Sequence, residues 1–313
     1  MPKFQVDIDK VVGYKYPPLK VSFNKRDLIL YALSIGIKDD ELKYLYELDK
    51  NFTPFPTYPV VLNLKGNSPD VNLFAETVNF GNPIPGLPDI DPNRIIHGEQ
   101  KIEILNPLPT SGEFEIHGKI NGVYDKGSGL LIERTNTLVD AKTGKEYCIM
   151  TFQSFNVGYG GFGGPKGSKS PNYKPPKDKK SDAIDVLQTS KDQAILYRLS
   201  GDYNPLHIDP TIAPKLGFEK PILHGLCSYG IASHAIVKHL ANNNPELLKS
   251  ISVRFNAPVY PGETLETYMW KVPSEKLNET NVIFITKVKE RDIIVLSNGL
   301  AVLKNPGKSN AKL

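Results

Sequence analysis

The feature that most constrains this chain is a segment near its middle that cannot fold by itself. Residues 158–182, GYGGFGGPKGSKSPNYKPPKDKKSD, consist mostly of glycine, proline, serine and lysine. A segment of this composition buries too little apolar surface to offset the entropy lost on ordering it. We therefore expect a linker there, with folded domains at 1–157 and 183–305 and a tail at 306–313. A length of 313 residues suits two domains of ordinary size.

The two parts of the chain on either side of this linker resemble each other. Residues 30–34 (LYALS) lie in a helical pattern, and residues 196–200 (LYRLS) do the same. Further on, 107–113 (PLPTSGE) is matched by 258–263 (PVYPGE), each between strand-like runs. Because both pairs recur in the same order, the sequence predicts a duplicated fold with insertions of different length.

Each half combines a helix with several strands. Helices are predicted by apolar periodicity at 24–35 and, after a turn, within 221–240. Runs rich in β-branched and aromatic residues predict strands at 97–105, 112–124, 130–140, 146–157, 251–257, 264–272, 281–290 and 292–303. This is an α+β fold in which each antiparallel sheet wraps a helix. Pairing the two sheets side by side would cover one edge strand of each.

Composition narrows the function further. The chain is 40% hydrophobic and 23% charged, and it has no apolar run near the roughly 18 residues of a membrane span. Its start, MPKFQVDIDK, lacks the pattern of a secretory signal. Most of the net charge of +4 comes from lysines in the linker, so nucleic-acid binding is not expected. The two cysteines, Cys148 and Cys227, fit neither a zinc site nor a disulfide framework and are expected to be buried.

The strongest chemical signal is the stretch 197–207, YRLSGDYNPLH. Gly201 and Pro205 bracket a sharp turn directly after a helix, so one short loop carries Asp202, Asn204 and His207. A carboxylate, an amide and an imidazole are thereby brought together. Taken singly, each residue is more often structural, because Asp and Asn commonly cap or turn a chain.

A second segment, 221–230 (PILHGLCSYG), changes that balance. It places Gly225 where a helix begins, and the first N–H groups of a helix have no partner inside it. Such a terminus can stabilise the negative charge that develops on a thioester oxygen. The alternative is that Gly225 only permits close packing. The first half has Ile35-Gly36-Ile37 where the second has Gly201-Asp202, as expected of a duplicated enzyme with one site lost.

Residues 200–207 followed by 221–230 resemble the type 2, or R-specific, enoyl-CoA hydratases of the MaoC-like group, which includes the hydratase domain of peroxisomal multifunctional enzyme type 2. The resemblance continues through 97–100 (HGEQ), 125–129 (DKGSG), 160–164 (GGFGG) and 258–262 (PVYPG). It implies a double hot-dog fold. In this fold the second half is catalytic, and the first half, without a long central helix, accommodates the acyl chain.

The resemblance also assigns roles to residues. Asp202 and His207 match the catalytic pair, Asn204 the amide that orients water, and Gly225 the oxyanion-hole N–H. The positions that match the contacts of the CoA thioester are His97, Gly98, Lys126, Asp202, Tyr203, Asn204, Pro205, Leu206, His207, Gly225 and Phe255. Glu47 matches a glutamate of the family that is functional or structural, and Arg198 is expected to support the loop. No cofactor is implied, and no residues have a recognisable metal-ligand spacing around His207 and Asp209.

The reaction implied is reversible hydration of a trans-2-enoyl-CoA to a (3R)-3-hydroxyacyl-CoA in peroxisomal fatty-acid β-oxidation. The C-terminal tripeptide Ala311-Lys312-Leu313 is close to the Ser-Lys-Leu address and would bind the peroxisomal import receptor. A homodimer is implied by the resemblance. The alternatives are a (3R)-hydroxyacyl thioester dehydratase in chain building, a thioesterase, and a non-catalytic acyl-thioester binding protein.

Overall fold

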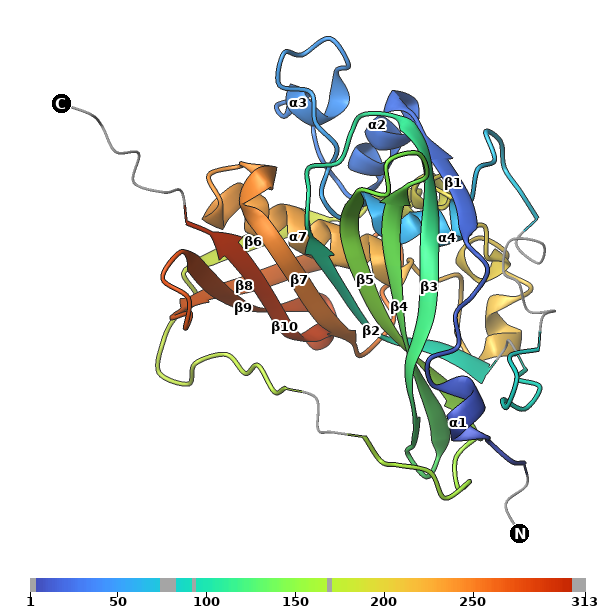
Figure 1. The fold of residues 1–313 in the computed structure, drawn as a ribbon. Coiled ribbons are helices and arrows are strands. Elements are labelled where there is room, and N and C mark those ends of the chain that lie inside the picture. The colour runs from blue at the N-terminus through green and yellow to red at the C-terminus, as the bar shows by residue number, and fades with distance from the viewer. Residues whose placement is uncertain (1–3, 74–82, 92–93, 168–170, 306–313) are drawn as a thin grey trace.

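A computed structural model describes the chain except for residues 1–3, 74–82, 92–93, 168–170 and 306–313. Its centre is one ten-stranded antiparallel sheet (Figure 1). The strands of the first half are β1 (Leu19–Phe23), β2 (Ile95–Ile104), β3 (Gly112–Asp125), β4 (Gly129–Asp140) and β5 (Glu146–Val157). Those of the second half are β6 (Ala183–Gln188), β7 (Leu248–Phe255), β8 (Thr264–Val272), β9 (Glu279–Val288) and β10 (Ile293–Lys304).

The strand order confirms the duplication that the sequence predicts. It runs β1-β3-β4-β5-β2 in the first half and, mirrored across the centre, β7-β10-β9-β8-β6 in the second. The two halves meet where β2 pairs with β7, with Lys101 opposite Ser252 and Ile102 opposite Ile251. We call this pairing the seam. It turns the two expected sheets into a single continuous one, so neither β2 nor β7 is left as an edge strand.

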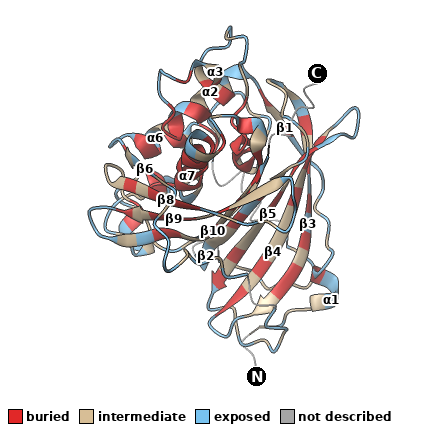
Figure 2. Cartoon of the chain, turned by 90° about the vertical axis from the view of Figure 1, so that its left-hand side faces the viewer, coloured by how far each residue is buried: buried red, intermediate tan, exposed pale blue. Residues whose placement is uncertain are grey.

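The long helix of the fold is α7 (Gly225–Leu240), which lies along one face of the sheet and is buried over most of its length (Figure 2). The described residues of the first half include no helix of this length. That half instead has α2 (Lys25–Ser34), which begins with a capping box at Asn24, and shorter helices. The second-half counterpart of α2 is α6 (Gln193–Arg198), and the two helices contact each other.

The remaining helical segments in the described part of the chain are short. They are α1 (Ile8–Val11), α3 (Leu42–Leu45), η1 (Tyr58–Val61), α4 (Leu62–Lys65), η3 (Pro205–His207), η4 (Ala213–Leu216) and η5 (Pro245–Leu247). None of the helices in the described part of the chain combines the length and the apolar character needed to cross a membrane.

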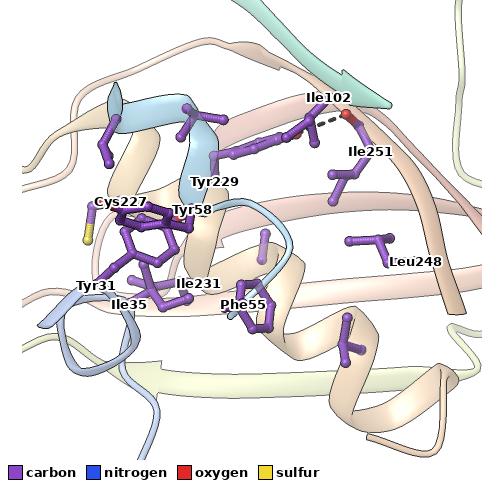
Figure 3. Close-up of a cluster of buried hydrophobic side chains, with 14 of the residues drawn as sticks. Tyr31, Ile35, Phe55, Tyr58, Ile102, Cys227, Tyr229, Ile231, Leu248 and Ile251 are labelled. Atoms are coloured by element: carbon purple, nitrogen blue, oxygen red, sulfur yellow. Dashed lines mark hydrogen bonds between the residues drawn. The ribbon is translucent and has the colours of Figure 1, made fainter. Parts of the chain in front are cut away.

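The hydrophobic core is shared by the two halves (Figure 3). Tyr31 and Tyr58 of the first half pack beside Cys227 and Tyr229 of α7, and all four are fully buried. The Tyr229 hydroxyl donates to the backbone oxygen of Ile251 on β7 at 2.9 Å, which ties the helix to the seam. Because residues of both halves form one continuous core, the halves stabilise each other. Both cysteines are free and buried, as predicted.

Two features differ from the sequence-based expectations. The edge strands β1 and β6 were not predicted. The linker has no helix or strand in its described part, but it is held against the sheet at several points. The N–H groups of Gly161 and Gly163 both donate to the Asp125 carboxylate at 2.8 Å, and the Trp270 indole donates to the Lys179 backbone oxygen at 3.0 Å.

Candidate active site

The loop between α6 and η3 holds the predicted acidic and imidazole groups. Gly201 enters it with a φ of +130°, and a Cβ at this position would lie 2.6 to 2.9 Å from the Cβ, Cα and N atoms of Lys65. Only glycine fits this combination of conformation and close approach. The Asn204 side chain then accepts a hydrogen bond from the Leu206 N–H at 3.0 Å, and the Asn204 N–H donates to Asp202 Oδ1 at 3.3 Å. These two hydrogen bonds hold the loop in its conformation, and Asn204 Oδ1 is occupied as the acceptor of a backbone N–H.

The His207 ring is held so that its Nε2 atom can accept a hydrogen bond. Its ring is 9% exposed, and Nδ1 lies 2.8 Å from the Ile222 backbone oxygen. Because a carbonyl can only accept, Nδ1 carries the proton and Nε2 keeps its lone pair. Burial lowers the pKa of His207, although the nearby Asp202 charge opposes the shift. Burial raises the pKa of Asp202, with His207 opposing. The two residues thus form an acid–base pair in surroundings that disfavour charge on either.

His224 is a third member of the site that the sequence reasoning did not assign. Its ring stacks on that of His207 with centroids 3.6 Å apart, and its Nε2 donates to the Asp202 backbone oxygen at 3.1 Å. Burial, together with the neighbouring His207, lowers the pKa of His224 well below its usual value, so the ring is neutral at physiological pH. The only sequence signal was its place directly before Gly225.

These three side chains also raise the question of a metal site. One ligand atom from each of Asp202, His207 and His224 lies within 4.8 Å of the others. However, the two imidazole planes are stacked with an angle of only 28° between them. A histidine binds a metal in the plane of its ring, so rings stacked in this way cannot both direct a lone pair at one ion. The arrangement suits proton transfer better than metal binding.

The start of α7 completes the site. Gly225 is the first residue of the helix, and in the described part of the chain its N–H has no hydrogen-bond acceptor. A Cβ at Gly225 would lie 3.1 Å from the ring of Phe255, so this ring covers the helix terminus closely. His97 also packs against Phe255, edge to face, with ring centroids 5.0 Å apart. Burial lowers the pKa of His97 to about 4, and its Nε2 is buried without a partner.

The other predicted residues are more scattered. Gly98 lies at a bulge between β2 and β5, beside His97. Arg198 stacks over the Tyr203 ring at 5.0 Å and supports the loop. Pro205 and Leu206 belong to η3.

Two of the predicted residues have no contact with the pair. Lys126 lies at the turn between β3 and β4, where its Nζ donates to the Lys166 backbone oxygen at 2.6 Å. Glu47 is exposed after α3 and forms no hydrogen bond or ion pair with the described residues. A surface cleft of about 700 Å³ beside the end of α2 includes none of the predicted site residues.

Comparison with known proteins places the chain in a family. A model described as MFE-2 hydratase 2 N-terminal domain matches residues 21–158, and a MaoC like domain matches residues 172–292. A Dictyostelium discoideum protein named probable enoyl-CoA hydratase 2 is 42% identical over 303 residues, which cover 96% of this chain and 97% of that protein. The chain belongs to the MaoC-like enoyl-CoA hydratase 2 family. This confirms the resemblance on which the assignment of a hydro-lyase rests.

Further relatives and solved structures show how the chain compares in length and in fold. Mouse peroxisomal multifunctional enzyme type 2 is 40% identical over 92% of the chain, which spans 37% of that enzyme. A MaoC-like dehydratase from Phytophthora capsici has a TM-score of 0.87 at 39% identity and covers 97% of this chain and 100% of its own. A Mycobacterium tuberculosis protein described as a double hot-dog fold matches in fold alone, with a TM-score of 0.55 at 12% identity over 95% of this chain and 97% of its own. The predicted fold class is therefore confirmed.

Proposed function

We propose that the protein hydrates trans-2-enoyl-CoA reversibly to (3R)-3-hydroxyacyl-CoA. The observation that carries this proposal is the convergence of His207 and the Asp202 carboxylate beside a helix N-terminus at Gly225, whose N–H has no acceptor among the described residues. Acid–base groups and an N–H donor are what addition of water to a conjugated thioester requires.

In the proposed mechanism, one water molecule is held between Asp202 and His207. Its oxygen bonds to C3 of the substrate while one of its protons passes to the pair. The electrons of the C2–C3 double bond shift toward the thioester oxygen, where the Gly225 N–H stabilises the negative charge. A proton from the pair then reaches C2 on the same side, which restores the carbonyl. His224 holds the backbone of Asp202 and the ring of His207, and is a positioning residue in this scheme.

The site also supports the reverse reaction, dehydration of a (3R)-hydroxyacyl thioester, because one set of groups catalyses both directions. Two other functions would use these residues differently. A thioesterase would direct water at the carbonyl carbon, and a non-catalytic binding protein would need neither Asp202 nor His207. An Nε2 lone pair on His207 with no partner among the described residues favours acid–base catalysis over simple binding. The relative named probable enoyl-CoA hydratase 2 favours hydration over hydrolysis of the thioester.

We further propose that the two halves have different roles. The second half, 183–305, contributes the acid–base pair, and the first half, 1–157, accommodates the acyl chain where no helix equivalent to α7 is described. A role in peroxisomal β-oxidation is supported by the name of the mouse relative and by the C-terminal tripeptide, which lies outside the described residues and would bind the import receptor. A homodimer is part of the same proposal, by analogy with the family.

The experiment is to follow loss of the ultraviolet absorbance of trans-2-decenoyl-CoA and to analyse the product on a chiral column. We expect the 3R product from the wild-type protein and a rate roughly 10²- to 10⁴-fold lower from His207→Ala. His117→Ala is the matched control, because His117 is half-exposed on β3 and pairs with Glu115. Tight binding without turnover would overturn the proposal, and release of free CoA would indicate a thioesterase.

A further inference from the structure

A charged side chain lies on the inner face of the first half of the sheet, between two hydrophobic clusters. Along β4 the side chains of residues 130, 132, 134, 136 and 138 share one face. Leu138 belongs to the main core, and Ile132 belongs to a smaller cluster under α1. Between them lie Arg134 and Asn136, where apolar residues would be expected. The inner face is thus interrupted by a polar band in the half that has no equivalent of α7 in its described part.

Arg134 has no charged partner in the described part of the chain. Its guanidinium lies over the ring of Tyr16 at 5.0 Å and 6.0 Å from the ring of Phe152, and its Nε is buried with no acceptor. Other arginines of the chain do have acidic partners. Arg254 pairs with Glu99 and Arg291 pairs with Glu263, and both of these arginines are exposed. A guanidinium stays charged in proteins and offers five donors, so leaving one half-buried and unpaired is unfavourable. An anion would remove that cost.

A line of rings connects Arg134 to the candidate active site. Phe152 lies 6.0 Å from the guanidinium, His97 lies 5.9 Å from Phe152, and Phe255 lies 5.0 Å from His97. Phe255 in turn covers Gly225. A ligand whose thioester sits at Gly225 would have to extend along this line of rings to bring a second group to Arg134.

We propose that Arg134 binds an anionic group of the bound acyl-CoA. The anion is either a phosphate of CoA or a carboxylate at the far end of the acyl chain, since both oxyanions accept two hydrogen bonds from one planar guanidinium. This inference rests on the proposed hydratase function for the identity of the ligand. It makes Arg134 a determinant of which thioesters the protein prefers.

The test measures binding of saturated ligands, which cannot be hydrated, so it does not depend on turnover. Wild-type protein and Arg134→Met are titrated calorimetrically with decanoyl-CoA, with its N-acetylcysteamine thioester, which lacks phosphates, and with ω-carboxydecanoyl-CoA. The matched control is Lys145→Met. It removes one positive charge that lies over a tyrosine ring at 5.2 Å, but at the exposed turn after β4. The midpoint of thermal unfolding of each variant is recorded to establish that it is folded.

Each source of the anion gives a different pattern. If Arg134 binds a phosphate, Arg134→Met weakens both CoA thioesters roughly ten- to hundredfold and leaves the N-acetylcysteamine ester unchanged. If it binds a carboxylate, only the ω-carboxy ligand is weakened by that factor. In either case Arg134→Lys gives an intermediate loss, because it keeps the charge without the planar fork.

Two results would overturn the assignment: equal binding of all three ligands by wild type and Arg134→Met, or an equal loss for every ligand. If the binding pattern holds but the wild-type protein hydrates no enoyl thioester, the hydratase function fails and the anion site stands.

Discussion

Gly201 offers a sharp test of how the loop positions the acid–base pair. In Gly201→Ala, the new Cβ would lie 2.8 Å from the Lys65 Cα and 2.9 Å from its backbone N, atoms that cannot rotate away. Overpacking of this kind costs about 1–3 kcal/mol, and a non-glycine residue at a φ of +130° adds strain of about 1–3 kcal/mol. We therefore expect the free energy of unfolding to fall by roughly 2–6 kcal/mol. Because Asp202 follows directly, the rate constant kcat should fall about 10²-fold if the loop shifts by 1 Å or so.

The matched control is Gly217→Ala. Gly217 also has a positive φ, +85°, but a Cβ there would meet nothing within 4 Å. Backbone strain alone should lower the free energy of unfolding of Gly217→Ala, by about 1 kcal/mol, and its hydration rate should stay at the wild-type value. Urea unfolding and initial rates with a saturating enoyl-CoA give both quantities for each variant. If the two variants agree within about 0.5 kcal/mol and both keep wild-type kcat, the close approach to Lys65 does not position the loop.

Three further outcomes follow from the same geometry. The acid limb of the kcat/KM profile should lie below pH 6.5, because burial lowers the pKa of His207 and protonation removes its lone pair; a limb above pH 7 would contradict this. His224→Phe keeps a ring beside His207 but removes the donor to the Asp202 backbone, so kcat should fall about tenfold with little change in KM, as steady-state rates would show. Although burial opposes it, the hydrogen bond and charge of His234 lower the pKa of Glu41, and this stabilisation is complete above pH 4.5 and lost as the pH falls through the lowered value. Glu41→Gln should therefore cost about 1–3 kcal/mol at pH 7 in urea unfolding, and the difference should shrink in acid; a difference that is constant with pH would argue against the ion pair.

The sequence predicted the long strands and the two main helices because their periodic patterns are local. It missed β6 for a physical reason. In that edge strand Ile184 and Val186 are 47% and 57% exposed, while Asp185 lies on the opposite face and its carboxylate binds His239 at 2.7 Å. The apolar alternation therefore points away from the core, opposite to the usual rule. β1 is only five residues long and follows two prolines, so its signal was too short to separate from a loop.

The residues of the site also fall into those that a local pattern predicts and those that it does not. Asp202, Asn204 and His207 were predictable as a group because one loop carries them. The ring stack of His224 on His207 was not, because it depends on how the turn before α7 meets that loop. The same holds for the contact of Arg134 with Tyr16, which comes from a distant part of the chain, whereas Phe152 is the partner of Arg134 on the neighbouring strand. The sequence alone does not show which distant segments of the chain come into contact.

The seam between β2 and β7 has a practical consequence. The backbone pairing from Glu99 to Glu103 and the shared tyrosine core join the halves directly, in addition to the linker, whose described residues contact both halves. Two separately expressed pieces, cut within 158–182, would each present a matching strand edge and apolar surface to the other. The protein is thus a natural scaffold for fragment complementation, in which recovered enzyme activity would report that two fused partners have met.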